Sequence, residues 1–255
     1  AAMESTQHSI ADAAIFGDDL DVDADRIRID EPISLDSTSQ SGSDGPPRFP
    51  VSDGTAPVIV GVDQAFEDDT AISAVVAIQG REVLTISTAR TPLESPYIPG
   101  LLAFREGPPI IEALQSLSVE PDIVFFDGSG RIHFRQAGIA THVGVIFDVP
   151  SIGVAKNPLC GTPDSQIEAP LPAGATIPIR ADASVDAPQG TILGYAFQSK
   201  QFENPRRRHV NPLYVSPGHR ASAETAVTLT QAVCAGYKLP EPTRLADRVA
   251  DDFKA

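Results

Sequence analysis

Runs of apolar and β-branched residues alternate with short polar turns in the middle of the chain. The first three runs are VIVGVD (58–63), TAISAVVAI (70–78) and EVLTISTAR (82–90). Runs of this composition are typical of β-strands, and the polar turns EDD and QGR separate them. The pattern therefore predicts three consecutive strands in an antiparallel meander.

After residue 100 the pattern becomes one of alternating helices and strands. Pro108 and Pro109 open a predicted helix, IIEALQSL, because proline suits the first turn and the apolar residues recur at helical spacing. The segment DIVFFDG (122–128) is continuously apolar, which indicates a fully buried strand. The remaining predicted elements are a helix near 136–147, strands at 151–156, 192–198 and 212–218, and a closing helix within 222–237. We therefore expect an α/β fold with a mixed α+β sheet, in the order of a ribonuclease H-like domain: three antiparallel strands, then parallel strands with flanking helices.

Residues 1–50 differ from the rest of the chain in composition. They hold 11 acidic and 3 basic side chains, which is −8 of the total net charge of −15. Their segments GDDLDVDAD (17–25) and STSQSGSDGPP (37–47) are typical of a solvated extension. We therefore expect a disordered acidic extension over 1–50, whose removal leaves activity intact, and a folded domain over 51–255.

The whole chain is acidic, with 34 acidic and 19 basic side chains. Only four of the basic residues are lysines, at positions 156, 200, 238 and 254, and the others are arginines. This composition suits a protein that stays soluble in concentrated salt, and the alternative is an ordinary acidic cytosolic protein. Taken alone, the charge disfavours a nucleic-acid partner, because affinity for phosphate backbones comes from Lys and Arg.

Several classes of protein are excluded. No apolar run reaches the roughly 20 residues that a membrane span requires, so we expect no membrane partner. Two cysteines, Cys160 and Cys234, are too few for a disulfide scaffold, and the N-terminal residues lack the pattern of a secretion signal. We therefore expect a cytoplasmic location.

Acidic residues end two of the buried strands. Asp63 ends VIVGVD and Asp127 ends DIVFFD. An ionised carboxylate there costs several kcal/mol unless something compensates, and a divalent cation does so directly. Two such carboxylates on neighbouring strands would suit Mg²⁺ or Mn²⁺, whereas the alternative for each is an aspartate that begins a turn.

Three further polar residues follow predicted strands or precede helices. Glu106 is either a third metal ligand or a partner of the helix dipole. Lys156 ends the strand GVAK and could neutralise a phosphate. His219 follows a strand directly and is either a residue that reaches the cleft or an ordinary loop histidine.

Two other chemistries are set aside. The spacing of Asp19, Asp21 and Asp23 resembles a calcium loop, but its sixth position is Ala24 instead of Gly. The segment around Ser129 resembles the turn of a serine hydrolase nucleophile, but Asp127 stands where that turn needs glycine. The first pattern is that of an acidic extension, and the second does not indicate a hydrolase of that class.

Taken together, the motifs of the chain resemble the endonuclease V family over about residues 57–248. They occur in the family's order, and as a set they are highly specific. The matching segments are 61–63 (GVD), 97–100 (YIPG), 104–108 (FREGP), 127–128 (DG), His133 with Arg135, 138–142 (GIATH), 153–156 (GVAK), 160–161 (CG) and 216–220 (SPGHR).

The resemblance implies a ribonuclease H-like fold, with 51–255 as the catalytic domain, and an enzyme that depends on Mg²⁺, with Mn²⁺ as an expected substitute. It places the metal carboxylates at Asp63, Glu106 and Asp127, with Lys156 and His219 near the scissile phosphate. It implies a strand-separating wedge of Tyr97, Ile98 and Pro99 and a lesion pocket near Gly128, Leu159, Cys160 and Gly161. Phosphate contacts are expected from Arg105, His133, Arg135 and Arg220.

Two positions depart from the family pattern. Ser129 stands where the family usually has His, and Phe134 where it usually has Pro. Both changes leave the implied metal ligands intact. They bear on the shape of the lesion pocket and on substrate preference.

We therefore expect a monomeric endodeoxyribonuclease of DNA repair, from a halophilic archaeon. Its implied substrate is DNA containing deoxyinosine, cut at the second phosphodiester bond 3′ to the lesion to leave a 3′-hydroxyl and a 5′-phosphate. One alternative is the same nuclease acting mainly on inosine-containing RNA. Another is a protein that binds inosine without cutting, although such a protein would not need all three carboxylates together with Lys156 and His219.

Overall fold

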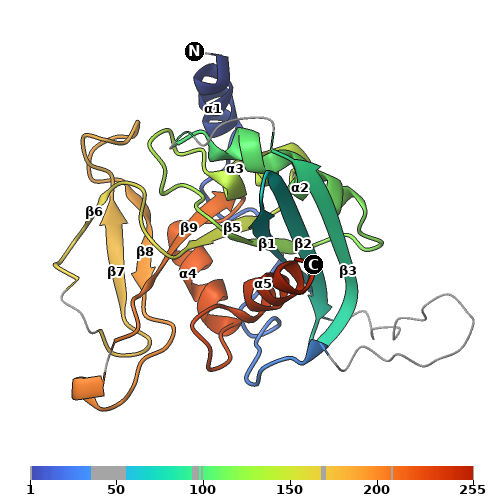
Figure 1. Ribbon diagram of the computed structural model, residues 1–255. Coiled ribbons are helices and arrows are strands. Elements are labelled where there is room, and N and C mark those ends of the chain that lie inside the picture. The colour runs from blue at the N-terminus through green and yellow to red at the C-terminus, as the bar shows by residue number, and fades with distance from the viewer. Residues whose placement is uncertain are drawn as a thin grey trace, which may run out of the picture.

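The computed structural model describes residues 2–35, 56–93, 98, 100–167, 171–207 and 209–254. Figure 1 shows the arrangement of its elements. In chain order they are α1 (Ala2–Ala13), β1 (Val58–Glu67), β2 (Thr70–Gln79), β3 (Glu82–Pro92), α2 (Leu102–Gln115), β4 (Ile123–Asp127), α3 (Ile139–Phe147), β5 (Ser151–Ala155), β6 (Thr162–Pro163), β7 (Thr176–Arg180), β8 (Ile192–Phe197), the 3₁₀ helix η2 (Pro205–Arg207), β9 (Leu213–His219), α4 (Ala223–Ala232) and α5 (Glu241–Asp252).

The described strands form one mixed sheet in the order β3-β2-β1-β4-β5-β9-β8-β7-β6. Strands β1, β2 and β3 pair antiparallel as predicted, and β4 and β5 then add parallel to β1. Strand β9 runs antiparallel to β5, and β8 runs antiparallel to β9. The mixed α/β fold class is thereby confirmed. No helix among the described residues is long and apolar enough to cross a membrane.

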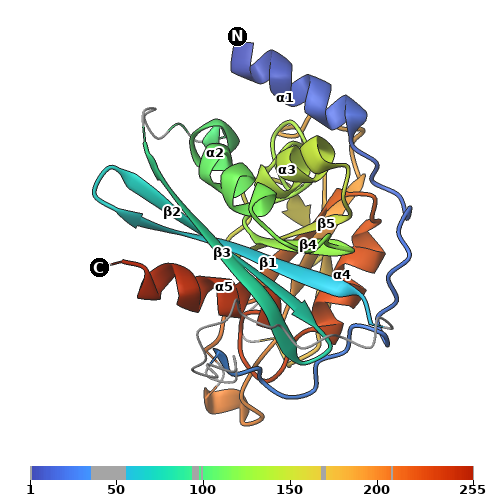
Figure 2. The ribbon, with the colours of Figure 1, turned by 90° about the vertical axis from the view of Figure 1, so that its right-hand side faces the viewer.

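Helices cover both faces of the sheet, as Figure 2 shows. Because side chains alternate along a strand, Val60 and Val62 of β1 join one apolar cluster while Ile59 joins the other. The cluster of Val60 and Val62 packs against α2 and α3. The cluster of Ile59 packs against α4 and α5. The central strands are therefore buried on both sides, which explains their continuously apolar sequences.

Helix α5 docks on the backbone of β1 at Gly61. A Cβ atom at this position would lie 1.9 Å from the carbonyl oxygen of Pro242, near the start of α5. Real side chains do not approach this closely, so the contact requires glycine. Gly61 therefore sets how near α5 comes to the part of β1 that carries Asp63.

Helix α2 begins at Leu102, six residues before the predicted start at Pro108. Pro108 and Pro109 lie inside the helix. A proline at this depth removes the hydrogen bond that its N–H would donate to the carbonyl one turn earlier. The prediction was wrong because it used proline as a start signal, whereas this helix continues through both prolines and so includes Glu106.

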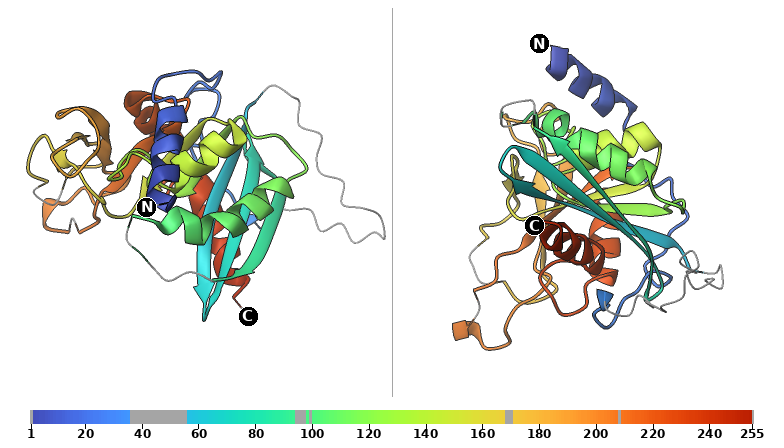
Figure 3. Two further views of the ribbon diagram at one scale, coloured as in Figure 1. Left: turned by 90° about the horizontal axis from the view of Figure 1, so that it is seen from above. Right: turned by 45° about the vertical axis from the view of Figure 1, so that its right-hand side comes forward.

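The N-terminal residues also differ from the sequence-based expectation. Residues 2–13 form α1, and residues 14–35, which we call the N-terminal belt, pack along the core (Figure 3). Three apolar side chains of the belt, Ile27, Ile29 and Ile33, are at least 95% buried, and the amide of Ile29 donates to the carbonyl of Ala232. Their burial among acidic neighbours explains why overall composition suggested a solvated segment. Residues 36–50 lie outside the described residues.

Candidate active site

Asp63 and Asp127 lie beside each other at one edge of the sheet. Strands β1 and β4 run parallel, with Val62 opposite Phe126, so the next residue on each strand is an aspartate. This edge holds the carboxyl ends of β4 and β5 and the adjoining part of β1 at Asp63, and we call it the catalytic edge. The structure thus brings together the two carboxylates expected as metal ligands.

Asp63 is held in its neutral form. Burial, reinforced by the nearby charge of Asp127, raises its pKa to about 9. Its side chain is hydrogen-bonded to Asp247 of α5, an arrangement of two carboxyls that needs one proton. Asp247 was not among the predicted site residues, although an acidic residue among the buried helix positions Leu245, Ala246 and Val249 was a usable signal.

Glu106 faces the same edge from α2. Burial, with a contribution from Asp127, raises its pKa to about 7. Gln64, next to Asp63, donates from its amide nitrogen to the backbone carbonyl of Glu106 at 2.9 Å. This bond ties β1 to α2, so the helix that carries Glu106 is anchored beside the two aspartates.

Lys156 provides the positive charge in this group. Its ammonium lies 2.6 Å from Oδ2 of Asp127. Within the described ranges, no three His, Cys, Asp or Glu side chains already stand where they could share a metal ion. The carboxylates do fit a hard divalent cation in chemistry, because their raised pKa values reflect buried negative charge without enough compensation.

A pocket of about 240 Å³ opens next to the carboxylates. Glu106 and Asp127 form part of its wall, and Gly128 and Leu159 line it as expected for a lesion pocket. Its other lining residues are Gly100, Leu102, Ala103, Ser129, His133, Ala137, Gly138, Ile139, Ala155 and Asn157. Cys160 and Gly161 are not among the lining residues. Cys160 instead packs in a separate apolar cluster, and Gly161 lies against the backbone of Arg180.

His133 holds the turn beside the pocket, and its side chain is buried. Its Nδ1 accepts from the amide of Arg135, so Nε2 carries the proton and donates to the carbonyl of Gly100 at 3.1 Å. Burial lowers its pKa to about 4. We expected a phosphate contact from His133, whereas the structure buries it. Of the expected wedge, Ile98 is exposed, and Tyr97 and Pro99 lie outside the described residues.

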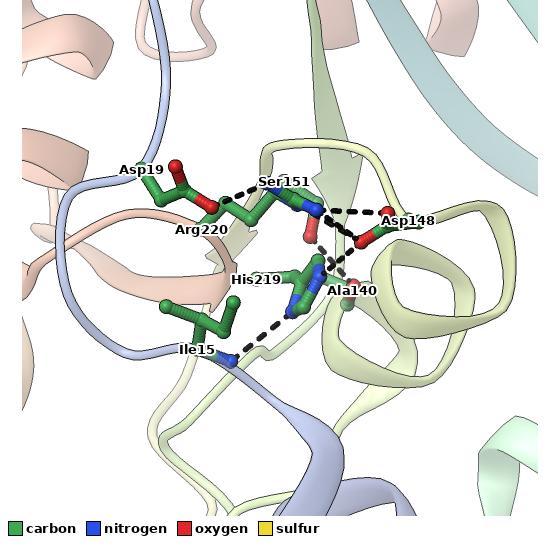
Figure 4. A network of polar contacts seen from close by, with 7 residues as sticks. All are labelled: Ile15, Asp19, Ala140, Asp148, Ser151, His219 and Arg220. Atoms are coloured by element: carbon green, nitrogen blue, oxygen red, sulfur yellow. Dashed lines mark hydrogen bonds and ion pairs between the residues drawn. The ribbon is translucent and has the colours of Figure 1, made fainter.

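His219 lies at the opposite edge of the sheet from the carboxylates. Because β9 runs antiparallel to β5, its last residue pairs with Ser151, the first residue of β5, whereas Asp127 pairs with Val154. Figure 4 shows His219 bonded to Asp148 and to the amide of Ile15. The structure therefore does not bring His219 to the candidate site.

The expected phosphate arginines differ in their surroundings. Arg135 pairs with Glu4 of α1 at 2.6 Å, and Arg220 pairs with Asp19 and Asp148. Both therefore hold the N-terminal residues in place. Arg105, on α2 beside Glu106, has a buried Nε without a hydrogen-bond partner in the part of the chain that the structure describes, which keeps it a candidate for phosphate contact.

A second buried imidazole makes the fold sensitive to acid. His142 packs edge-on against Phe104, and burial lowers its pKa to about 4. The folded protein therefore holds this group neutral, while the unfolded chain binds a proton below about pH 6.5. The contribution of neutral His142 to the free energy of unfolding is fully present above pH 6.5 and is lost as the pH drops towards 4. Between pH 7 and pH 5 the loss is about 2 kcal/mol.

We expect His142→Leu to remove this part of the acid sensitivity. The measurement is urea denaturation of wild type and variant at pH 8, 7 and 5, with pH 8 as the reference. The free energy of unfolding of wild type, relative to that of the variant, should fall by about 2 kcal/mol from pH 7 to pH 5. A difference between the two proteins that is the same at all three pH values would show that His142 does not titrate on unfolding.

The chain is similar to a known protein family over most of its length. A family model described as Endonuclease V matches residues 49–248. Endonuclease V of Halobacterium salinarum is 55% identical, with 99% of this chain and 93% of the relative aligned. The protein of the same name from Haloarcula marismortui is 52% identical, over 99% and 92%. These halophilic relatives agree with the acid-rich, lysine-poor composition.

Solved structures give the same result for the fold. The catalytic domain of human Endonuclease V has a TM-score of 0.74 and 28% identity, covering 98% of this chain and 94% of that one. Endonuclease V of Ciona intestinalis, in complex with a 24mer DNA containing an inosine followed by a ribo-adenosine, has a TM-score of 0.67 and 23% identity, over 98% and 94%. From its sequence match, its fold and the carboxylates at its catalytic edge, the chain belongs to the endonuclease V family of nucleases.

Proposed function

We propose that this protein is a metal-dependent DNA repair endonuclease that recognises deoxyinosine. It cuts the second phosphodiester bond 3′ to the lesion and leaves a 3′-hydroxyl and a 5′-phosphate. The observation that carries the proposal is the shared wall between the pocket and the carboxylates: Glu106 and Asp127 line the pocket and also belong to the candidate metal site. The complex of the Ciona protein with inosine-containing DNA supports the same substrate.

The pocket has the size and chemistry for a flipped purine base. A cavity of about 240 Å³ accommodates one base, and its lining combines apolar side chains with polar groups of Ser129 and Asn157. Gly128 and Gly138 bring backbone close to its walls, because a Cβ at Gly138 would lie 2.2 Å from the carbonyl oxygen of Ser129. Glycine at these positions therefore lets the segments that form the pocket wall pack tightly.

Asp63, Asp127 and Glu106 would hold the Mg²⁺ or Mn²⁺, with Asp247 adjoining them. A bound divalent cation supplies an activated water and neutralises charge on the phosphate. The buried carboxyls must lose their protons before they can ligate, so binding is favoured at higher pH. Lys156 would move from Asp127 towards the phosphate, where its compact ammonium balances the developing charge.

The experiment is a nicking assay on a 5′-labelled duplex with one deoxyinosine and on a matched duplex with deoxyadenosine. With Mg²⁺ or Mn²⁺, we expect a cut one nucleotide beyond the inosine, a product that a polymerase extends, and no cut in the control or in excess chelator. A matched inosine-containing RNA strand in the same assay compares the alternative substrate. An intact inosine duplex after incubation would refute the proposal.

A further inference from the structure

All four lysines of the chain lie around the catalytic edge. Lys156 follows β5 directly and contacts Asp127. Lys200 follows the end of β8, Lys238 lies in the loop between α4 and α5, and Lys254 follows α5, where it pairs with Asp251. In a chain that uses arginine for its other cations, this gathering of compact ammonium groups is not matched by any other described region.

The sheet register explains why two of these lysines leave at the same edge. Ala155 of β5 pairs with Tyr214 of β9, and Tyr214 pairs with Ala196 of β8. Since β9 is antiparallel to both, β5 and β8 run in the same direction and end at the same edge of the sheet. Neighbouring strands lie about 4.8 Å apart, so the two strand ends are separated by roughly 10 Å.

Lys200 and Lys238 are joined through direct contacts. Ser199 donates from its hydroxyl to the carbonyl of Lys238. The ring of Tyr237 is 47% exposed, with the ammonium of Lys200 5.5 Å from its centroid and the guanidinium of Arg244 4.8 Å from it. Burial and the charge of Lys156 lower the pKa of Lys238, and Asp127 raises it, so Lys238 is within electrostatic range of both groups. Like charges held together in this way favour a polyanion as ligand.

These groups lie beyond the carboxylates when the site is followed from the pocket. The pocket is lined by α2 and the segment between β4 and α3, on the face of the sheet that α2 and α3 cover, and by Ala155, Asn157 and Leu159 at the end of β5. The carboxylates stand at the edge, and the α4–α5 loop with Tyr237 and Lys238 belongs to the other face. A strand whose flipped base enters the pocket and whose scissile phosphate reaches the carboxylates would therefore continue over the lysines.

We propose that Lys200, Lys238 and Tyr237 form a track that begins beside Lys156 and binds the sugar–phosphate backbone on the 3′ side of the cut. The proposal rests on the proposed function, because the 3′ direction follows from a base pocket before the cut. Each lysine of the track contributes one short contact to a phosphate, and Tyr237 positions the ammonium of Lys200, which lies against its ring. Short contacts of this kind suit an acidic protein whose longer-range attraction to DNA is weak.

The test uses two inosine substrates with the same 5′ part, one with a 12-nucleotide 3′ arm beyond the cut and one with a 2-nucleotide arm. For the double variant Lys200→Gln and Lys238→Gln, we expect KM on the long-arm substrate to rise roughly tenfold with kcat within twofold of wild type. KM on the short-arm substrate should stay within twofold. The logarithmic salt dependence of binding to the long arm should fall by about one for each lysine removed.

Two control variants isolate the track. Lys200→Arg with Lys238→Arg keeps the charge and should retain most of the wild-type KM. Arg81→Gln removes one positive charge from the β2–β3 turn, at the edge opposite the carboxylates, and should leave KM unchanged. Equal KM for wild type and the glutamine variant on the long arm, or an equal rise on both arms, would overturn the proposal. If wild type cuts neither substrate, the proposed function itself has failed.

Discussion

Replacing Asp63 by Asn is expected to reduce nicking of an inosine strand on the order of a thousandfold, while the protein remains folded. Asn has the shape of Asp and can still accept the hydrogen bond that the amide of Gln64 donates to Oδ1 at 2.8 Å. It cannot supply the negative charge that a divalent cation requires. The measurement is the single-turnover rate with saturating Mn²⁺, beside Asp148→Asn, an exposed carboxylate at the opposite edge, as the matched control.

The same variant should be more stable than wild type in alkaline, metal-free buffer. The pKa of Asp63 is raised from 3.8 to about 9, so the folded wild type binds more protons than the unfolded chain between these values. Its stability therefore falls as the pH rises from about 4 towards 9, and an Asn side chain has no such loss. Urea denaturation at pH 5 and pH 8 in chelator measures this difference. If Asp63→Asn nicked DNA at the wild-type rate, Asp63 would not be a metal ligand.

Deleting residues 1–35 is expected to abolish cooperative folding. Ile27, Ile29 and Ile33 are buried in the cluster beneath α4 and α5, and full burial of such a side chain contributes about 1.5–3 kcal/mol. The burial free energy of the three side chains together approaches the total free energy of unfolding of an ordinary domain, about 5–15 kcal/mol. The belt also supplies polar contacts, since the amide of Ile33 donates to the buried carboxylate of Glu241 at 2.7 Å. Circular dichroism and thermal unfolding of the truncated chain provide the measurement.

A shorter deletion, of residues 1–13, is the matched control. It removes α1 and leaves the belt, so we expect the fold to persist. It also removes Gln7, whose side chain is fully buried and donates to the carbonyl of Gly100 at 2.7 Å, the same oxygen that His133 contacts. Nicking should therefore weaken without unfolding. A stable, fully active protein lacking residues 1–35 would contradict our assignment of the belt to the core and restore the expectation of a dispensable extension.

Local pattern predicted the central strands well, for a physical reason. The β-branched runs at 58–63, 70–78 and 122–128 carry their own signal, because a strand buried on both faces must be apolar throughout. Asp127 ends β4 as predicted, whereas β1 continues past Asp63 to Glu67. The two aspartates still lie side by side, because the parallel pairing of β1 with β4 extends to Val62 and Phe126. The same reasoning wrongly predicted a solvated N-terminal extension. The three buried isoleucines there are spaced two and four residues apart among acidic residues, so they do not form a recognisable apolar run.

The errors at the site come from long-range pairing. The residues around SPGHR do not indicate that β9 runs antiparallel to β5. That strand direction alone places His219 at the edge of the sheet opposite the carboxylates. Asp247 was missed because its role depends on where α5 docks, not on its neighbours in sequence. Arg135 and Arg220 were expected to meet phosphate, and the structure pairs them with acidic residues at least 72 positions away. Such partners cannot be read from spacing.

The close contact between Gly61 and Pro242 has a consequence for how this chain can evolve. Any side chain at position 61 must lift the start of α5, and the same movement would draw Asp247 away from Asp63. Mutational tolerance at position 61 is therefore set by catalysis as well as by packing. In a selection for inosine-dependent repair, a larger residue there could be recovered only with compensating changes along α5, so these distant positions should vary together.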